Sequence, residues 1–242
     1  MYNSIHSLLM RVIILSLFAL FILKNSLLKA QNYQVPKNEF RATWVATVIN
    51  LDWPQTGGLA PRFQKADFKN KLDKLKEVGI NAVYFQIRTE GDALYDSPIE
   101  PWSKYLTGEE GVPPEPYWDP LMFAVKEAHK RGMELHAWFN PYRAMRSIPS
   151  DFSQKIVLNQ EIDPSLEIVL NREFDQDSKM KVSRTSERAA NHVSNTHPEW
   201  LLVMNDKIAI FDPGLQEAIE YNRDIVMDVV NRYDVDAVSY TH

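Results

Sequence analysis

The stretch Glu134-Leu-His-Ala-Trp-Phe-Asn-Pro-Tyr-Arg143 decides how the rest of the chain is interpreted. Residues 135–140 alternate between apolar side chains and polar or aromatic ones, which predicts a β-strand, and Pro141 then removes a backbone donor and ends it. Directly before this stretch, a segment with helical spacing closes at Gly132, a residue type common at helix C-termini. The order helix, glycine, strand and polar loop predicts an α/β fold with functional side chains at the strand's carboxyl end.

The same order recurs along the chain, where apolar, β-branched runs alternate with amphipathic helical segments. The expected strands cover residues 41–50, 81–88, 134–140 and 235–242. The expected helices cover residues 66–78, 119–131 and the segment that follows the turn Asp212-Pro-Gly214. Such alternation is typical of a parallel sheet with helices packed outside it.

Two architectures fit this pattern, a (β/α)8 barrel of the TIM type and a doubly wound open sheet. No glycine-rich phosphate turn follows the first strand, and site-like residues recur at three strand ends rather than at one crevice, so the barrel is favoured. A barrel needs eight strands in typically about 250 residues. The sequence provides four, and we therefore expect a barrel that is truncated after about the fourth strand.

Composition excludes several classes of protein. The 242 residues are 45% hydrophobic and carry a net charge of -5 without a dense basic run, so nucleic acid is not an expected partner. The absence of cysteine rules out a disulfide framework and a thiol nucleophile.

The N-terminus is predicted to direct export. Residues 1–30 resemble a signal peptide, with Arg11 before an apolar run over 12–23 that is too short for a stable membrane span after cleavage; an uncleaved anchor is the alternative. We therefore expect a secreted or periplasmic protein.

The remainder of the chain is predicted to form one domain behind a short linker. Residues 31–39 are the expected linker, and residues 40–242 are the expected partial barrel domain. Residues 144–207 have weak periodicity and are expected to form a long insertion loop, with short strands around 167–171 and 200–204 as an alternative.

Four motifs together resemble the glycosyl-hydrolase-like 10 family of exported bacterial proteins. They are Arg41-Ala-Thr-Trp44, Phe85-Gln-Ile-Arg-Thr-Glu-Gly-Asp-Ala-Leu-Tyr-Asp-Ser97, His136-Ala-Trp-Phe-Asn-Pro-Tyr142 and Tyr233-Asp-Val-Asp236. The resemblance implies a TIM-barrel domain related to glycoside hydrolases that cleaves a polysaccharide or a peptidoglycan-type glycan of the cell envelope.

The sequence departs from that family at its end. Family members continue the fourth strand into a motif with two aspartates, whereas Val238-Ser-Tyr-Thr-His242 has neither. The resemblance places the acid/base at the end of strand four and the nucleophile at the end of strand seven. We therefore expect this chain alone to lack part of the catalytic apparatus and to be inactive.

Glycoside hydrolysis needs two carboxyl groups that flank the scissile bond. The carboxylates at the predicted strand ends are those of Asp52, Glu90, Asp92 and Asp212. Asp92 is the catalytic candidate because it lies in the matching motif next to a glycine; the alternative is an aspartate that caps a turn. Glu90 is expected to face solvent, and Asp212 to begin a turn and helix.

A second group of residues is predicted to bind substrate. Guanidinium and amide groups form directional hydrogen bonds with sugar hydroxyls, and aromatic rings stack on sugar rings. The predicted substrate-binding residues are Arg41, Trp44, Gln86, Arg88, Trp138, Asn140 and Tyr142. The alternatives are that the arginines pair with buried carboxylates and that the tryptophans fill the core.

The sequence predicts neither a metal site nor a cofactor. His136 has no Asp or Glu at a spacing that completes a zinc set, and a hydrogen-bonded structural role is expected for it. There is no Gly-x-Ser-x-Gly elbow, phosphate loop or dinucleotide fingerprint. The expected partner is a carbohydrate polymer or oligosaccharide. The competing hypothesis is a carbohydrate-binding module without catalysis.

Overall fold

The computed structural model describes residues 15–16, 39–148, 188–204 and 207–240. The chain divides into two compact units, Met1–Glu39 and Phe40–His242. Only three residues of the first unit are described, so the predicted signal peptide and linker lie almost entirely outside the described residues. Within the described part of the chain, no helix combines the length and the apolar composition that a membrane crossing requires.

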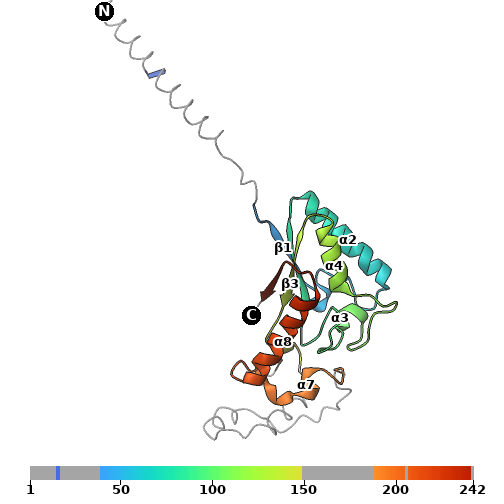
Figure 1. The fold of residues 1–242 in the computed structure, drawn as a ribbon, viewed down its shortest axis with the longest axis vertical. Helices are drawn as coiled ribbons and strands as arrows, with labels where there is room; N and C mark the ends of the chain where they lie inside the picture. The colour runs from blue at the N-terminus through green and yellow to red at the C-terminus, as the bar shows by residue number, and fades with distance from the viewer. Residues whose placement is uncertain (1–14, 17–38, 149–187, 205–206, 241–242) are drawn as a thin grey trace, which may run out of the picture. The chain divides into compact units, whose positions relative to one another are not determined.

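A four-stranded parallel sheet forms the centre of the second unit (Figure 1). The strands are β1 (Ala42–Val45), β2 (Ala82–Arg88), β3 (Glu134–Phe139) and β7 (Ala237–Tyr240). They lie in the order β1-β2-β3-β7, and each neighbouring pair is parallel. The four predicted strands are confirmed, although β1 is shorter than expected because the chain after Val45 bends into the 3-10 helix η1 (Val48–Asn50).

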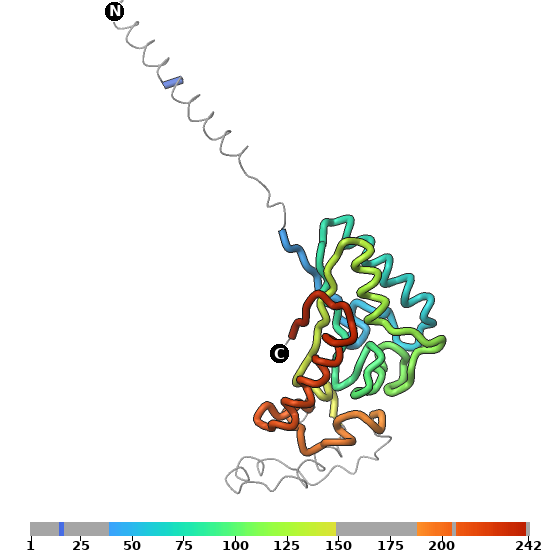
Figure 2. Tube along the Cα trace, viewed as in Figure 1, coloured from blue at the N-terminus to red at the C-terminus, as the bar shows by residue number. Residues whose placement is uncertain are grey.

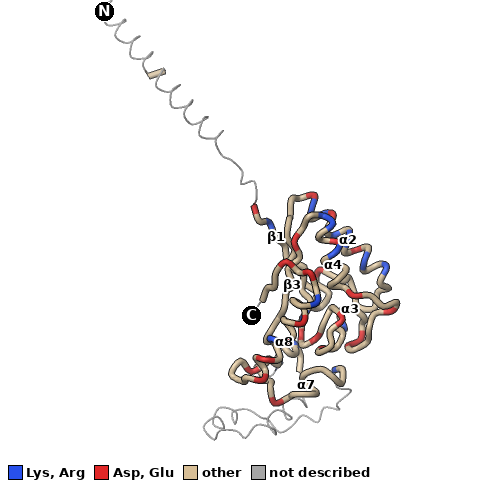
Figure 3. The backbone as a smooth tube through the Cα atoms, viewed as in Figure 1, with Lys and Arg blue, Asp and Glu red and all other residues tan. Residues whose placement is uncertain are grey.

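Three helices cover one face of this sheet. They are α2 (Pro61–Glu77), α4 (Pro120–His129) and α8 (Gln216–Arg232). Helix α4 begins where predicted, because the Asp119 side chain accepts a hydrogen bond from the Met122 amide and Pro120 occupies the first turn. Figure 3 marks several Lys and Arg positions along the backbone of α2, in keeping with the predicted amphipathic helix.

The main hydrophobic core lies between the helices and the sheet. Each of the three helices contributes buried apolar side chains to it, and so do the alternate residues of β1, β2 and β3. The largest contributions come from Trp53, Phe68, Leu72, Phe85, Ile87, Leu121, Leu135, Phe139, Ile225 and Val229. Burial of such side chains is the main driving force for folding, at roughly 1.5–3 kcal/mol for each large apolar side chain.

The topology distinguishes between the two architectures left open by the sequence. A doubly wound sheet reverses its strand order at a switch point and carries helices on both faces. Here the strands follow one another in chain order, and α2, α4 and α8 pack against the same core on one face. The parallel α/β sheet is therefore singly wound over the described residues.

The segment predicted as a long insertion loop, residues 144–207, contains strand β5 in its described part and is bordered by two further strands. Strands β4 (Arg143–Met145), β5 (Leu201–Met204) and β6 (Ile208–Phe211) form an antiparallel sheet in the order β4-β6-β5. A second core, with Val193 and Phe211 buried, lies beneath this sheet. The strand predicted around 200–204 is confirmed, whereas the one around 167–171 lies outside the described residues.

Three short helical turns complete the described elements, and each lies in a connection rather than in a layer. They are α3 (Lys104–Thr107), α7 (Val193–Thr196) and η2 (Pro198–Trp200). Figure 2 shows the described chain from residue 188 in orange, followed by α8 in red. Val193 and Leu201 of the orange part belong to the second core.

The sheet face opposite the helices carries a group of rings that we call the aromatic face: Phe40, Trp44, Tyr84, His136 and Trp138. Successive side chains of a strand point to opposite faces, so these residues alternate with the core residues of the same strands. The Trp44 ring stacks on Tyr84 with centroids 4.4 Å apart, and Trp138 packs edge-on against Trp44 at 4.7 Å. Trp44 is 46% exposed.

Candidate functional site

Arg88 is the last residue of β2 and joins the loops that follow β2 and β3 at the carboxyl end of the sheet. Its guanidinium forms a two-pronged ion pair with Glu100, at 2.7 and 2.6 Å, and both side chains are buried. Its third nitrogen, Nη1, donates to the carbonyl oxygens of Asn140 and Pro141 after β3, at 2.9 and 3.0 Å. Arg88 was predicted to bind substrate, and the alternative was an ion pair with a buried carboxylate. Its contacts are those of the ion pair.

Gln86 is also buried, and its side chain stabilises a neighbouring loop. Its side-chain oxygen accepts hydrogen bonds from the amides of Thr47 and Val48, at 2.9 and 3.0 Å, and thereby fixes the loop that follows β1. The side chain is 1% exposed, and its contacts hold the edge of the site together.

Asp92 shapes the turn that follows β2. One carboxylate oxygen accepts from the Thr89 amide at 3.0 Å, the Thr89 hydroxyl at 2.6 Å and the Glu90 amide at 2.7 Å. Burial would raise the pKa of Asp92, but hydrogen bonds from the side chains of Ser103 and Thr89 hold it below the usual range. The contacts are those of the turn-capping alternative, and the predicted catalytic role of Asp92 stays a prediction.

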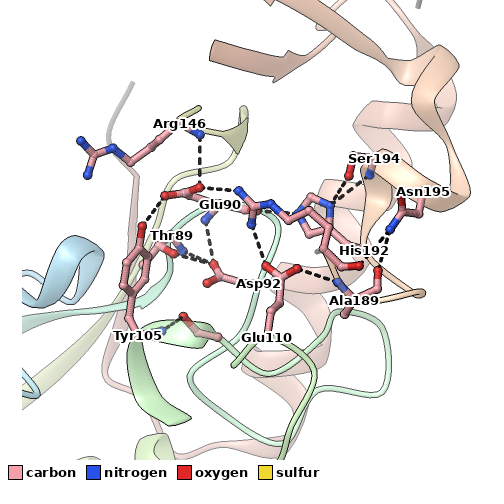
Figure 4. Close-up of polar contacts among 12 residues, drawn as sticks. Thr89, Glu90, Asp92, Tyr105, Glu110, Arg146, Ala189, His192, Ser194 and Asn195 are labelled. Atoms are coloured by element: carbon pink, nitrogen blue, oxygen red, sulfur yellow. Dashed lines mark hydrogen bonds and ion pairs between the residues drawn. The ribbon is translucent and has the colours of Figure 1, made fainter. Parts of the chain in front are cut away.

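Glu90 is 1% exposed, so the expectation that it faces solvent is wrong. The Tyr105 hydroxyl donates to one carboxylate oxygen at 2.6 Å, and the Arg146 amide donates to the other at 3.1 Å (Figure 4). Burial and the bond to Glu90 raise the pKa of Tyr105, so its hydroxyl remains a proton donor. Glu90 is buried because the second core folds over it, which the local sequence does not indicate.

Arg188 closes the ion cluster from the far end of the insertion. It donates to Glu90 and to Glu110, both at 2.6 Å, and its side chain is 7% exposed (Figure 4). Burial would lower the pKa of Arg188, but the charges of Glu110 and Glu90 raise it. The Ala189 amide adds a hydrogen bond to Glu110 at 2.9 Å. One cation thus pairs with two buried carboxylates, an arrangement that holds the loops together.

His192 packs against the same turn as a neutral ring. Its Nε2 lies 2.8 Å from the Glu90 carbonyl oxygen, which can only accept, so Nε2 carries the proton. Its Nδ1 accepts from the Ser194 amide at 3.1 Å. Burial and the nearby charge of Arg188 lower the pKa of His192 to about 4. Gly91, with φ +71°, fits beneath this ring, since an added Cβ would lie 3.0 Å from Nε2.

Asn140 and Tyr142 follow β3 at the same edge. Asn140 is buried, and its side-chain amide donates to the Thr89 carbonyl at 3.2 Å, which ties the β3 loop to the β2 turn. Tyr142 is 41% exposed. Trp138, one position before the end of β3, is half-buried on the aromatic face. Tyr142, Trp138 and Trp44 are therefore the predicted binding residues whose rings solvent reaches.

Arg41 lies at the other end of the sheet. Its backbone amide donates to the Asn81 side chain at 2.8 Å, and both residues directly precede the strands β1 and β2. Because both strands are parallel, this is the amino edge, opposite to Asp92 and Asn140. Arg41 precedes β1, so its backbone lies at the edge away from these residues, and its substrate-binding role stays a prediction.

His136 has a structural partner. Its Nε2 lies 2.8 Å from a carboxylate oxygen of Glu134, and its ring contacts Tyr84 and Phe40 on the aromatic face. Among residues that the structure describes, no group of three or more His, Cys, Asp or Glu side chains is placed to hold a metal ion.

Comparison with known proteins confirms the resemblance seen in the four motifs. The family model described as Glycosyl hydrolase-like 10 matches residues 39–241. This chain belongs to the glycosyl hydrolase-like 10 family. Its residues are 36% identical to glycosyl hydrolase YngK of Bacillus subtilis (strain 168) over 200 positions, and 35% identical to glycosyl hydrolase DigH of Escherichia coli (strain K12) over 214 positions.

The family member described here spans less than half the length of these relatives. The alignments cover 83% of this chain and 32% of YngK, and 86% of this chain and 42% of DigH. Among solved structures, alpha-L-fucosidase isoenzyme 2 from Paenibacillus thiaminolyticus aligns with a TM-score of 0.45 at 13% identity, over 85% of this chain and 24% of that one.

Several contacts of this glycosyl hydrolase-like 10 site escaped sequence reasoning. Glu100, Glu110, Arg188 and His192 had no role assigned, because they lie in loops without strand or helix periodicity. One signal in the sequence could have indicated that partners exist. Arg88 and Glu90 lie in or directly after the apolar strand β2, and charged side chains that become buried there require partners of opposite charge. Which loop would supply those partners is decided only by tertiary structure.

Proposed function

We propose that this protein is an exported member of the glycosyl hydrolase-like 10 family that binds a carbohydrate polymer at the carboxyl edge of its parallel sheet. The observation that carries the proposal is family membership combined with a singly wound sheet whose polar and aromatic residues gather at that edge. This is the edge at which (β/α)8 barrels hold their sites, and we propose that the sheet is part of such a barrel. Two relatives are named glycosyl hydrolases.

Exposed rings are the proposed sugar contacts. Trp138 and Trp44 present aromatic surface on the sheet face away from the helices, and Tyr142 adds a ring after β3. Aromatic rings bind the C–H surface of a sugar while hydroxyl groups remain solvated or hydrogen-bonded. Arg88, Gln86 and Asn140 support this wall from behind, because their polar atoms hold neighbouring loops.

Hydrolysis by a carboxylate pair is the proposed chemistry of the family fold. In this chain we propose that Asp92 lies beside the reaction centre and positions the Thr89–Glu90 turn. Glu90, Asp92 and Glu100 are each about 1–2% exposed and hydrogen-bonded within the protein. None of these three carboxyl groups is therefore open to a substrate, which supports the expectation of an inactive chain.

The same burial favours a second function, carbohydrate binding without catalysis. Carboxylates that are saturated by arginine and tyrosine donors stabilise loops and do not transfer protons easily. The two functions share the wall of exposed rings and differ only in whether a glycosidic bond is broken.

The test measures retention and cleavage of four soluble polysaccharides: starch, xylan, carboxymethylcellulose and glycol chitin. Affinity electrophoresis reports binding, and the release of reducing ends reports hydrolysis. We expect binding of at least one polymer without hydrolysis, and we expect Trp138→Ala to weaken binding at least tenfold, because the ring supplies contact area.

Phe63→Ala is the matched control, since Phe63 is 54% exposed on helix α2 and lies away from the proposed wall. Asp92→Asn keeps an oxygen acceptor for the turn and should leave binding within twofold. Hydrolysis by the wild-type chain that Asp92→Asn abolishes would establish the enzyme. Binding to none of the four polymers would reject the proposed function.

A further inference from the structure

The loop that follows β1 contains backbone strain at the carboxyl edge of the sheet. Ile49 has φ +49° and Asn50 has φ +55°, so both lie in the left-handed region. Asparagine tolerates this region, because its short side chain forms local hydrogen bonds. A β-branched residue there is a true outlier, because its branched Cβ crowds the backbone. Ile49 is therefore the strained residue of the pair.

One side chain of β2 and two side chains of the loop itself hold this loop in place. Gln86 accepts from the amides of Thr47 and Val48. The Asn50 side-chain amide donates to the carbonyl oxygens of Pro54 and Tyr105, at 2.9 and 2.8 Å. The Asp52 carboxylate accepts from the Ala46 amide at 2.8 Å. Strain persists where the surroundings over-determine the conformation, and these contacts do so here.

The strained side chain gains little burial in return. Ile49 is 51% exposed and Leu51 is 63% exposed, whereas the neighbouring Val48 is buried. Glycine or asparagine would satisfy the backbone at position 49 with less strain. A strained, exposed isoleucine thus adds nothing to folding that a less strained residue would not add. Strain of this kind gathers at sites where it serves binding.

The loop presents both apolar and hydrogen-bonding groups to solvent. Its apolar side chains, Ile49 and Leu51, stand next to Asp52, whose carboxylate is exposed and can accept a hydrogen bond from a hydroxyl group. A sugar has the matching character, with an apolar C–H surface bordered by hydroxyl groups. An apolar protein surface would match Ile49 and Leu51 but would offer no donor to the Asp52 carboxylate beyond the Ala46 amide that it already has.

We propose that Ile49, with Leu51 and Asp52 beside it, is a pre-formed contact that determines which sugar the site accepts. This inference rests on the proposed carbohydrate-binding function and adds a specificity-determining loop to it. Because the loop is held in its binding conformation before the ligand arrives, little ordering entropy is lost on binding.

The test compares Ile49→Asn with the wild-type chain, using the polymer that wild type retains most strongly among starch, xylan, carboxymethylcellulose and glycol chitin. Ile49→Asn relieves the strain and removes the apolar contact. We expect a higher urea midpoint of unfolding together with at least fivefold weaker binding. Val78→Asn is the matched control, because Val78 is 72% exposed at the C-terminus of α2 and has negative φ. It should change neither quantity.

Three results would overturn the inference. Unchanged binding by Ile49→Asn with a raised midpoint would show that the strained side chain does not contact sugar. Weaker binding together with a lowered midpoint would show that the variant disrupts the loop and that no strain was relieved. If the wild-type chain binds none of the four polymers, the proposed carbohydrate-binding function is rejected. This result is obtained before any variant is compared, so it is distinguishable from the other two.

Discussion

His192 shows how a single buried residue can make this fold sensitive to pH. The ring is neutral in the native state, because Glu90 accepts from Nε2 and the Ser194 amide donates to Nδ1. A second proton on Nδ1 would displace that donor and place a buried cation near Arg188. These are the physical reasons that the pKa of His192 falls to about 4.

The expected consequence is a loss of stability on mild acidification. The unfolded chain takes up a proton on this residue near pH 6.5, whereas the folded chain does so near pH 4. The unfolded state therefore binds more protons between these values, and stability falls as pH falls. Linkage gives about 2 kcal/mol of lost unfolding free energy between pH 7 and pH 5. Urea unfolding at both pH values measures the loss.

His192→Gln is the control, because glutamine can donate to Glu90 but does not titrate. Its unfolding free energy should change less over the same interval, by roughly the His192 contribution. Equal pH dependence in the two proteins would show that His192 is not the group responsible.

At the scale of single residues, the motif after β2 was recognised from the sequence, whereas the partners of its buried side chains were not. Gln86 and Arg88 were predicted to bind substrate, because amide and guanidinium groups form directional hydrogen bonds with sugar hydroxyls. In the structure each is saturated by backbone amides, carbonyls or Glu100. Glu100 lies twelve positions beyond Arg88 in a loop without periodicity, and no local pattern could pair the two.

The segment from Arg188 to Met204 is the element that the sequence described least well. It returns to the β2 turn as a short coil, continues as α7 and η2, and then enters strand β5. Its anchor is the Arg188 guanidinium, which bridges the carboxylates of Glu90 and Glu110.

Arg188→Met is predicted to release this element. The change leaves two buried carboxylates without their cation, and loss of one partner of a buried ion pair typically costs about 3–5 kcal/mol. We expect the amides of residues 188–196 and 89–92 to lose protection from hydrogen exchange, while those of β2 keep theirs. Hydrogen–deuterium exchange followed by mass spectrometry resolves these segments.

Arg223→Met serves as the control, because Arg223 pairs with Asp224 on the exposed surface of α8. No measurable change in exchange is expected from it. Retained protection of residues 188–196 in Arg188→Met would contradict the anchoring role.

Among the elements, β2, β3 and α4 were predictable to their ends, whereas the short strands β4 and β6 were not predicted. Strands β2 and β3 and helix α4 lie within about two residues of their predicted ends, because apolar alternation and capping residues define them. Strands β4 and β6 have three and four residues, too few for a period to stand out. Their antiparallel pairing joins segments on either side of the 149–187 gap in the described residues.

At the scale of the whole domain, one sheet face is packed and the other is not. Helices α2, α4 and α8 bury the first face in the main core, whereas Trp44 on the aromatic face is nearly half exposed. The strand order and the single helical layer were predictable from the repeat of strand and helix. Whether the chain forms part of an eight-stranded barrel stays a proposal.

The most direct test of carbohydrate binding at this face follows the indole N–H resonances of the tryptophans by NMR. The chain is titrated with an oligosaccharide of the polymer that it retains most strongly, and resonances are assigned by single Trp→Phe substitutions. Trp53 and Trp118 are internal controls, because they are 1% and 5% exposed in the helix-facing core. We predict shifts for Trp44 and Trp138 and none for Trp53 and Trp118. Saturating binding that leaves Trp44 and Trp138 unshifted would contradict a carbohydrate site on this face.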